Sequence, residues 1–366
     1  MDKKKQIPEK SYNEQRIRKL TQLYYSRKDV QKAIFDFSKN REIVPRYFEG
    51  FGKRPDSLQY EGDIFEMIRK GATSLHCSEE LWQDPLKIST ELSESQFNEL
   101  RTGWDLLIDI DSKYMDYSKI LAELIISILE FHGVKSIGIK FSGSKGFHLI
   151  VPFKAFPEEI NNIKTKDMFP EWPRIISKYL AEKTKKQLIQ KITELTISSK
   201  YVKDFEAFKE VIPDIILVSP RHLFRMPYSL HEKTSLASIV LRKDEIPTFQ
   251  LSDADPLKAK IKDFMPNAKE NEATELLIQA LDWYKEQNTE DDFSSSAKSK
   301  TEFKPVKLEK LSDNYFPPSI KKILQGVSDG RKRALFILIN LFRSLNLDKE
   351  ELEKRVYDWN KKNEIP

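Results

Sequence analysis

Two aspartates separated by one apolar residue are the clearest chemical signal in this chain. The stretch Asp105–Asp111 reads D-L-L-I-D-I-D, so Asp109 and Asp111 alternate with apolar residues. On a β-strand such positions share one face and lie roughly 6 to 7 Å apart. Two carboxylates at that spacing can share or bridge Mg²⁺ or Mn²⁺, which prefer oxygen ligands. The pattern predicts a metal-binding strand, and the alternative is an ordinary exposed strand face.

A glycine-containing turn follows at residues 142–148, read as S-G-S-K-G-F-H between two apolar runs. Glycine lets a backbone approach a ligand closely, while N–H groups, hydroxyls and lysine bind phosphate oxygens. The turn could therefore hold a triphosphate, although polar hairpin turns of this kind are also common. The residues that we single out are Ser142, Gly143, Ser144, Lys145 and His148.

A third polar cluster lies in residues 213–234, a strand-like stretch that ends in a turn at Pro227. Asp214 begins the stretch, and Arg225, His231 and Lys233 lie around the turn. An arginine and a histidine near one turn can bind the same anion. The alternative is a structural arginine and a surface histidine.

The elements that must position these residues follow from hydrophobic periodicity. Residues 104–111 predict a strand, Tyr117–His132 an amphipathic helix, and Val134–Phe141 a second strand. A third strand follows the glycine turn at residues 149–153. The order strand, helix, strand, turn, strand predicts an α/β or α+β core.

The domain organisation is expected to have three parts. Residues 1–256 form the main domain, in which the helical stretch 158–200 is interpreted as an insertion. Residues 257–310 contain a helix and then a polar, serine-rich linker. Residues 311–366 form a small helical domain.

Basic and aromatic residues interleave in residues 40–56. Such side chains on turns and short strands can hold phosphates and stack on bases. We predict nucleic-acid contacts from Arg46, Lys53 and Arg54, and the alternative is a surface hairpin whose aromatic side chains pack inward.

Composition excludes several classes of protein. With 366 residues and 39% hydrophobic residues, the chain is long and apolar enough to bury a core. The net charge of +5 is compatible with nucleic-acid binding but does not demonstrate it. Cys77 is the only cysteine, which excludes an intramolecular disulfide and a cysteine-rich zinc or iron–sulfur site. Without an apolar run of about 20 residues or a signal segment, we expect a cytoplasmic protein with no membrane partner.

The three polar stretches together resemble the motifs of the archaeo-eukaryotic primase superfamily, which contains the small catalytic subunit of DNA primase and primase-polymerases. I-D-I-D is similar to the first motif and S-G-S-K-G-F-H to the second. D-I-I-L-V-S-P-R-H-L-F-R-M-P-Y-S-L-H-E-K-T is similar to the third. The resemblance covers roughly residues 20 to 245.

The resemblance implies an α+β fold with a mixed-sheet, RRM-like primase-polymerase core and a small all-α C-terminal domain. It implies a two-metal, template-dependent nucleotidyl transferase that makes or extends primers from NTPs or dNTPs on single-stranded DNA. By this resemblance Asp109, Asp111 and Asp214 would hold Mg²⁺ or Mn²⁺. The triphosphate would be held by Ser142, Gly143, Ser144, Lys145, His148, Arg225, His231 and Lys233.

The C-terminal stretch 317–344 resembles the start of the iron–sulfur domain of the large primase subunit. Ser319 takes the place of that domain's first cysteine, so no cluster is expected, and the zinc module usual in the small subunit is absent too. The stretch is expected either to bind template or primer or to be a plain helical cap. The residues for binding are Lys321, Lys322, Arg331 and Arg333.

Two other functions compete with this interpretation. One is a non-catalytic nucleic-acid-binding protein that keeps the primase fold, and the other is a two-metal nuclease. A nuclease needs clustered carboxylates but no triphosphate site. Single-chain enzymes of the primase-polymerase kind occur in archaea, mobile elements and CRISPR-associated loci, so replication or CRISPR-adaptation proteins are the candidate partners.

Overall fold

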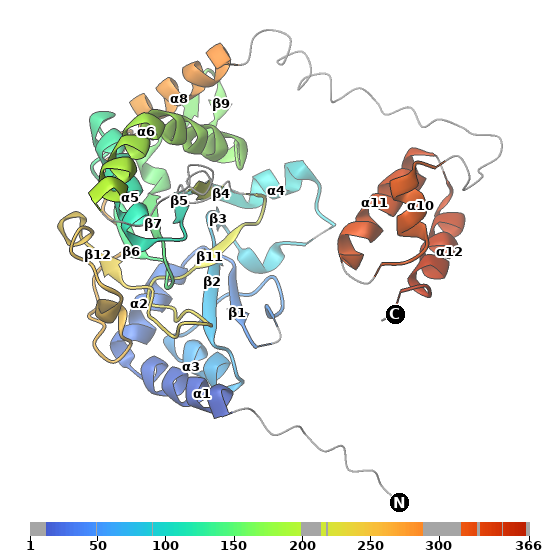
Figure 1. Ribbon diagram of the computed structural model, residues 1–366, viewed down its shortest axis with the longest axis horizontal. Coiled ribbons are helices and arrows are strands. Elements are labelled where there is room, and N and C mark those ends of the chain that lie inside the picture. Colours follow the sequence, from blue (N-terminus) through green and yellow to red (C-terminus); the bar gives the residue numbers. More distant parts are fainter. Residues whose placement is uncertain are drawn as a thin grey trace, which may run out of the picture. The chain divides into compact units, whose positions relative to one another are not determined.

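The computed structural model describes residues 12–48, 50–89, 91–198, 214–216, 219–287, 316–327, 330–345 and 347–363. The chain divides into two compact units, Met1–Gln287 and Asn288–Pro366 (Figure 1). The first unit combines helices with β-sheets, which confirms the α+β class, and the second is helical in its described residues. Among the described residues, no helix is long and apolar enough to cross a bilayer.

A five-stranded sheet forms the centre of the first unit, in the order β10-β5-β7-β6-β12. All of its neighbouring strands pair antiparallel, whereas a mixed sheet was expected. The first four strands and two helices follow one another as β5, α5, β6, β7, α6 and β10, which is the split βαβ order of RRM-like and ferredoxin-like folds. The bounds are β5 Leu106–Asp111, α5 Met115–Phe131, β6 Gly138–Phe141, β7 Phe147–Val151, α6 Glu171–Ser198, β10 Asp214–Ile216 and β12 Val240–Leu241.

Helices α5 and α6 cover one face of this sheet and pack against each other (Figure 1). Apolar side chains from every second strand position bury themselves against these helices, as in Ile108, Ile110 and Leu149. Helix α6 was expected to belong to an insertion. It is instead the second crossover helix of the core, because it contacts α5, β5 and β10.

A smaller antiparallel sheet has the order β1-β2-β11. Its strands are β1 Ile43–Arg46, β2 Ser74–Ser78 and β11 Leu223–Arg225. Three helices, α1 Tyr12–Tyr25, α2 Lys28–Ser38 and α3 Glu61–Arg69, pack together near it (Figure 1). Phe224 of β11 lies against His148 of β7, with ring centroids 6.0 Å apart, so the two sheets meet at this point.

The predicted strand over residues 104–111 is divided at Asp105. The part before it pairs with β3 and the part after it joins the central sheet. The division follows from the buried Asp105 carboxylate, which accepts hydrogen bonds from Arg41 and from the backbone N–H of Phe153. The remaining elements are β3 Glu80–Trp82, α4 Glu94–Leu100, β4 Arg101–Trp104, β8 Glu159–Ile160 and β9 Ile163–Lys164.

The first unit extends beyond the expected boundary at residue 256. Helix α8, Thr274–Gln287, packs against α6 and buries Leu276, Leu277 and Ala280. The predicted linker at residues 288–301 lies outside the described residues. The apolar face of α8 explains why this stretch belongs with the core rather than with the linker.

The second unit contains three described helices, α10 Pro318–Leu324, α11 Arg331–Ser344 and α12 Lys349–Asn360. They pack around a small core of their own that includes Phe316, Leu338, Phe342 and Trp359. The indole of Trp359 donates a hydrogen bond of 2.7 Å to the carbonyl of Ile323, which ties α12 to α10.

Candidate functional site

The first aspartate lies in a row of residues that crosses the central sheet. Antiparallel pairing places Ile216, Asp109, His148 and Lys140 opposite one another on β10, β5, β7 and β6. Residues directly opposite in an antiparallel sheet point to the same face, with Cβ atoms about 5 Å apart. This face is the one that α5 and α6 leave uncovered. The sheet therefore brings an acid, an imidazole and an amine together.

Asp109 and His148 are in direct contact. The Nε2 of His148 lies 3.2 Å from the Oδ1 of Asp109, and the Asp109 side chain is 20% exposed. Burial opposes ionisation of Asp109, but His148, Lys140 and His222 outweigh it and lower its pKa below the ordinary value. Burial and the charge of Lys140 lower the pKa of His148. At neutral pH an imidazole N–H therefore donates to a carboxylate.

The last member of the row, Lys140, is a fully buried lysine that the sequence did not single out as a site residue. The Nζ of Lys140 donates a 2.9 Å hydrogen bond to Ser238 and lies 5.8 Å from the ring of Phe224. Burial, reinforced by Arg225 and partly offset by Asp109, lowers its pKa from 10.5 to about 7. Its signal in the sequence was a charged residue inside an otherwise apolar strand.

Replacing Lys140 by Met is expected to stabilise the fold in a pH-dependent way. Below about pH 7 the folded and unfolded states both hold the proton, so the folded state bears the full cost of the buried charge. That cost decreases as pH rises and disappears above 10.5. Urea unfolding at about pH 6 should show a gain of roughly a few kcal/mol, and a smaller gain at about pH 9.5. An equal gain in stability at both pH values would contradict the lowered pKa of Lys140.

Asp111 ends β5 two residues beyond Asp109, with an exposed side chain. The backbone of Asp214 lies directly opposite Asp111, so the register places all three predicted metal ligands on one face at one end of the strand pair. The side chain of Asp214 is not among those that the structure describes. Among the described side chains, no group of three or more acidic, histidine or cysteine residues converges as a metal site.

The donor set nevertheless suits a hard divalent cation. Asp109 and Asp111 offer carboxylate oxygens from one face, and the lowered pKa of Asp109 keeps that carboxylate charged at neutral pH. Oxygen ligands of this kind favour Mg²⁺ or Mn²⁺ over softer metals. The residues present therefore fit the predicted cation, which Asp109 and Asp111 of β5 would hold.

The two glycines of the turn serve the protein's own packing. A Cβ at Gly146 would lie 1.9 Å from the carbonyl oxygen of Ile110, because the turn presses against the end of β5. Gly143 has a φ of +103°, and a Cβ there would lie 2.8 Å from the Cβ of His231. The hydroxyl of Ser142 accepts the backbone N–H of Gly146 at 3.2 Å. The glycine turn is thus fixed between two neighbours. One is β5, the strand that carries Asp109 and Asp111, and the other is the stretch 225–234, which we call the basic turn.

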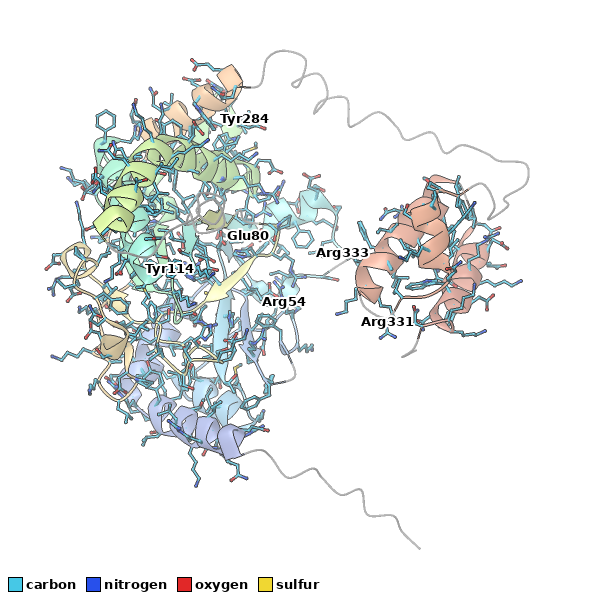
Figure 2. The ribbon with its side chains drawn as sticks, viewed as in Figure 1. Arg54, Glu80, Tyr114, Tyr284, Arg331 and Arg333 are labelled. Atoms are coloured by element: carbon cyan, nitrogen blue, oxygen red, sulfur yellow. The ribbon has the colours of Figure 1, made fainter. Side chains whose placement is uncertain are left out.

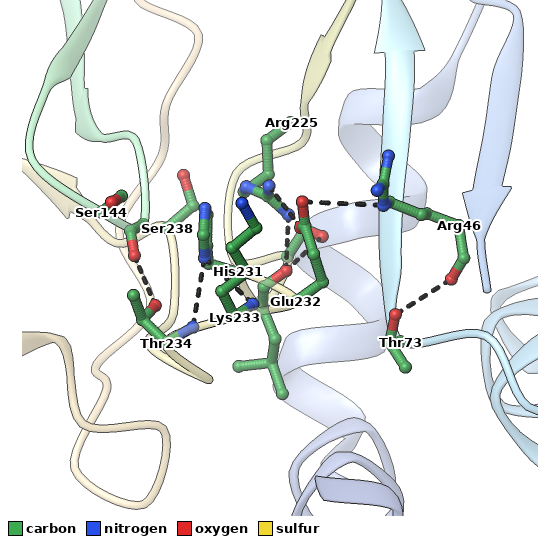
Figure 3. A network of polar contacts seen from close by, with 12 residues as sticks. Arg46, Thr73, Ser144, Arg225, His231, Glu232, Lys233, Thr234 and Ser238 are labelled. Carbon is green, nitrogen blue, oxygen red and sulfur yellow. Dashed lines mark hydrogen bonds and ion pairs between the residues drawn. The ribbon is translucent and has the colours of Figure 1, made fainter. Parts of the chain in front are cut away.

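Arg225 and His231 both lie beside Gly143 of the glycine turn (Figure 3). The guanidinium of Arg225 donates to the carbonyls of Ser142 at 3.1 Å and Leu230 at 2.7 Å. The Nδ1 of His231 accepts the backbone N–H groups of Lys233 and Thr234. Burial and Arg225 lower the pKa of His231 to about 4. The ring is therefore neutral and presents its Nε2–H as a donor.

The remaining predicted triphosphate contacts differ in exposure. Ser144 is partly buried, whereas Lys145 and Lys233 are exposed. The hydroxyl of Thr234 donates to the carbonyl of Gly143 at 2.7 Å, which joins the two turns (Figure 3). The structure thus brings the glycine turn and the basic turn together, and Lys145 and Lys233 are exposed on them.

Two of the three predicted nucleic-acid residues of the N-terminal part, Arg46 and Arg54, contact other residues of the protein. Arg54, labelled in Figure 2, donates to both oxygens of the buried Glu42 at 2.8 Å. Arg46 lies 3.6 Å from Glu232 and 4.9 Å from the ring centroid of Phe51, while Lys53 is exposed. Nucleic-acid contacts from these residues remain a prediction.

The four basic residues of the second unit that were predicted to bind template or primer are exposed. Lys321 and Lys322 lie on α10. Arg331 and Arg333, labelled in Figure 2, lie in the first turn of α11. Ser319, at the position of the cysteine in the resembled motif, is exposed in the first turn of α10. At these positions the basic side chains are accessible to a polyanion. Template binding by this unit stays a prediction.

A second carboxylate–imidazole pair near Asp109 was missed by the sequence analysis. The buried Glu79 follows β2 and contacts the Nδ1 of His222, which precedes β11. Burial raises the pKa of Glu79 to about 7, and Glu79 and Asp109 raise the pKa of His222 against its own burial. The pair forms through tertiary contact between β2 and β11, so no local pattern in the sequence indicated it.

These observations define an RRM-like core in which an acidic strand lies beside a glycine-containing turn with basic neighbours. Residues 108–242 match the family model described as DNA primase small subunit. This part of the chain contains all three motifs, and the match supports the archaeo-eukaryotic primase superfamily.

Two curated relatives were found by sequence. The DNA primase small subunit PriS of Pyrobaculum islandicum is 23% identical over 252 residues, which are 60% of this chain and 76% of that protein. An uncharacterized protein of Methanocaldococcus jannaschii is 31% identical over 150 residues, or 41% of this chain. The match spans 32% of the length of the Methanocaldococcus protein.

A solved structure, the polymerase domain from Mycobacterium tuberculosis ligase D in complex with DNA, matches with a TM-score of 0.41. The sequences are 13% identical, and the match covers 72% of this chain and 88% of that chain.

Proposed function

We propose that this protein is a template-dependent nucleotidyl transferase that synthesises or extends primers from nucleoside triphosphates. The observation that carries the proposal is the position of the glycine turn. It joins the ionised carboxylate strand of Asp109 on one side and the donors Arg225 and His231 on the other. Phosphoryl transfer needs acidic groups for cations and basic donors for phosphates at one place.

Each residue has a role that its contacts support. Arg225 is a fixed charged donor, and His231 is a neutral Nε2–H donor, so both can bind phosphate oxygens. His148 donates to Asp109 and orients its carboxylate. A divalent cation bound at Asp109 and Asp111 would lower the pKa of the attacking 3′-hydroxyl and neutralise charge on the leaving pyrophosphate.

The match of residues 108–242 to the DNA primase small subunit supports a primase-type nucleotidyl transferase at the level of the family. The proposal goes further and assigns DNA template, primer and Mg²⁺ or Mn²⁺ to this chain. A nuclease is less favoured, because Arg225, His231 and the glycine turn form an anion site that strand cleavage does not need.

Nucleotide binding separates the proposed activity from the nuclease. We expect a labelled dNTP or NTP to bind the full chain in the presence of Mn²⁺ and to be released by a chelator. We also expect no cleavage of single-stranded DNA under the same conditions. Strand cleavage without detectable triphosphate binding would favour the nuclease instead.

A further inference from the structure

An acidic residue occupies the anion-binding end of Arg225 (Figure 3). The carboxylate of Glu232 accepts a 2.7 Å hydrogen bond from Nη2 of Arg225, and its other oxygen lies 3.6 Å from Nε of Arg46. Glu232 directly follows His231 in the basic turn. A negative side chain thus lies where two predicted anion-binding arginines from different strands meet.

Arg225 keeps its position without Glu232. Its side chain is 8% exposed, and Nε and Nη1 donate to the carbonyls of Ser142 and Leu230. These two contacts fix the plane of the guanidinium and leave the Nη2 end directed at Glu232. Arginine binds a carboxylate and a phosphate with the same planar fork of donors, so either anion can take this place.

Glu232 is charged under ordinary conditions. Burial opposes its ionisation, but Arg225 and neighbouring donors outweigh burial and lower the pKa of Glu232. Its side chain is 22% exposed, so it has a path to solvent when another anion replaces it. Arg46 is 31% exposed, which gives an incoming anion access to the second arginine as well.

We propose that Glu232 is an internal anion that occupies the Arg225–Arg46 pair and is displaced by a phosphate group of the bound triphosphate. This inference rests on the proposed function, because it concerns the same nucleotide site. Gly143 lies beside both Arg225 and His231, so phosphates at the glycine turn reach the arginine end that Glu232 occupies. Glu232 then weakens nucleotide affinity. It also favours ligands of high negative charge, because only their attraction to the arginines exceeds the attraction that Glu232 loses on displacement.

The test compares the full-length protein with Glu232→Gln. Glutamine keeps an oxygen that accepts from Arg225 but removes the negative charge. We expect the variant to bind a dNTP in Mg²⁺, and inorganic tripolyphosphate without nucleoside, roughly tenfold more tightly than the unchanged protein. The matched control is Glu130→Gln, an exposed glutamate paired with Lys243, which should leave both affinities unchanged.

Unchanged or weaker binding by Glu232→Gln would overturn the proposal, since Glu232 would then be a structural or supporting residue. Glu232→Ala is a second variant for the same binding measurement, because Arg225 should stay in place through its contacts with Ser142 and Leu230. We expect it to tighten binding as well. Primer extension by the unchanged protein reports on the proposed function separately. Tighter binding in a chain without extension would support the internal anion and contradict the polymerase.

Discussion

Replacing Asp109 by Asn is expected to lower primer extension by roughly a thousandfold, with little effect on folding. Asparagine retains an oxygen that can accept from Nε2 of His148, so the row across the sheet keeps its hydrogen bond. The negative charge that holds a divalent cation is lost. The measurement is the rate of primer extension with Mg²⁺ or Mn²⁺ in excess, and Asp111→Asn should behave in the same way.

The matched control for this prediction is Asp116→Asn. Asp116 lies in the first turn of α5, close to β5 in sequence, but its side chain is 76% exposed and pairs only weakly with Lys119 at 3.4 Å. We expect extension by this variant to equal that of the unchanged protein. Full activity in both Asp109→Asn and Asp111→Asn would contradict a role for these two carboxylates in catalysis.

Replacing Gly146 by Ala is expected to reduce the free energy of unfolding by about 2 to 3 kcal/mol and to disable the site. The added Cβ would lie 1.9 Å from the carbonyl oxygen of Ile110. Because this atom belongs to the backbone of β5, the turn must move away from the carboxylate strand. Urea unfolding measures the first effect, and triphosphate binding at a temperature where the variant is folded measures the second.

Gly62→Ala is the control, since a Cβ at Gly62 meets no atom within 4 Å and the residue lies in helix α3. Alanine favours a helix more than glycine does, so this variant should be unchanged or more stable by up to about 1 kcal/mol. If Gly146→Ala unfolds at the same urea concentration as the unchanged protein, the close approach of turn and strand is incorrect.

The carboxylates and the glycine turn could be predicted because their signals are local. Asp109 and Asp111 alternate with buried apolar residues, and the turn joins two apolar strands, so a two-residue period sufficed. The order of the same elements left α/β and α+β open, and the family resemblance implied the α+β class. The division of the predicted strand at Asp105 was not foreseen, since it depends on a buried contact with Arg41.

The contacts between elements could not be predicted, because register is set by tertiary pairing. His148 lies opposite Asp109 only because β7 inserts between β5 and β6. Glu232 reaches Arg46 through the packing of the basic turn beside β1, a contact between residues far apart in sequence. The glycines were predicted to let a ligand approach the backbone, whereas in the structure they permit close packing of the turn against Ile110 and His231.

The most direct test of the proposed nucleotidyl transferase activity is primer synthesis and extension by the full chain. The protein is incubated with single-stranded DNA template, with and without primer, with Mg²⁺ or Mn²⁺, and with NTPs or dNTPs in separate reactions. We expect template-directed products that require the cation and disappear in Asp109→Asn. A folded protein that binds triphosphate but adds no nucleotide under any of these conditions would contradict the proposed activity.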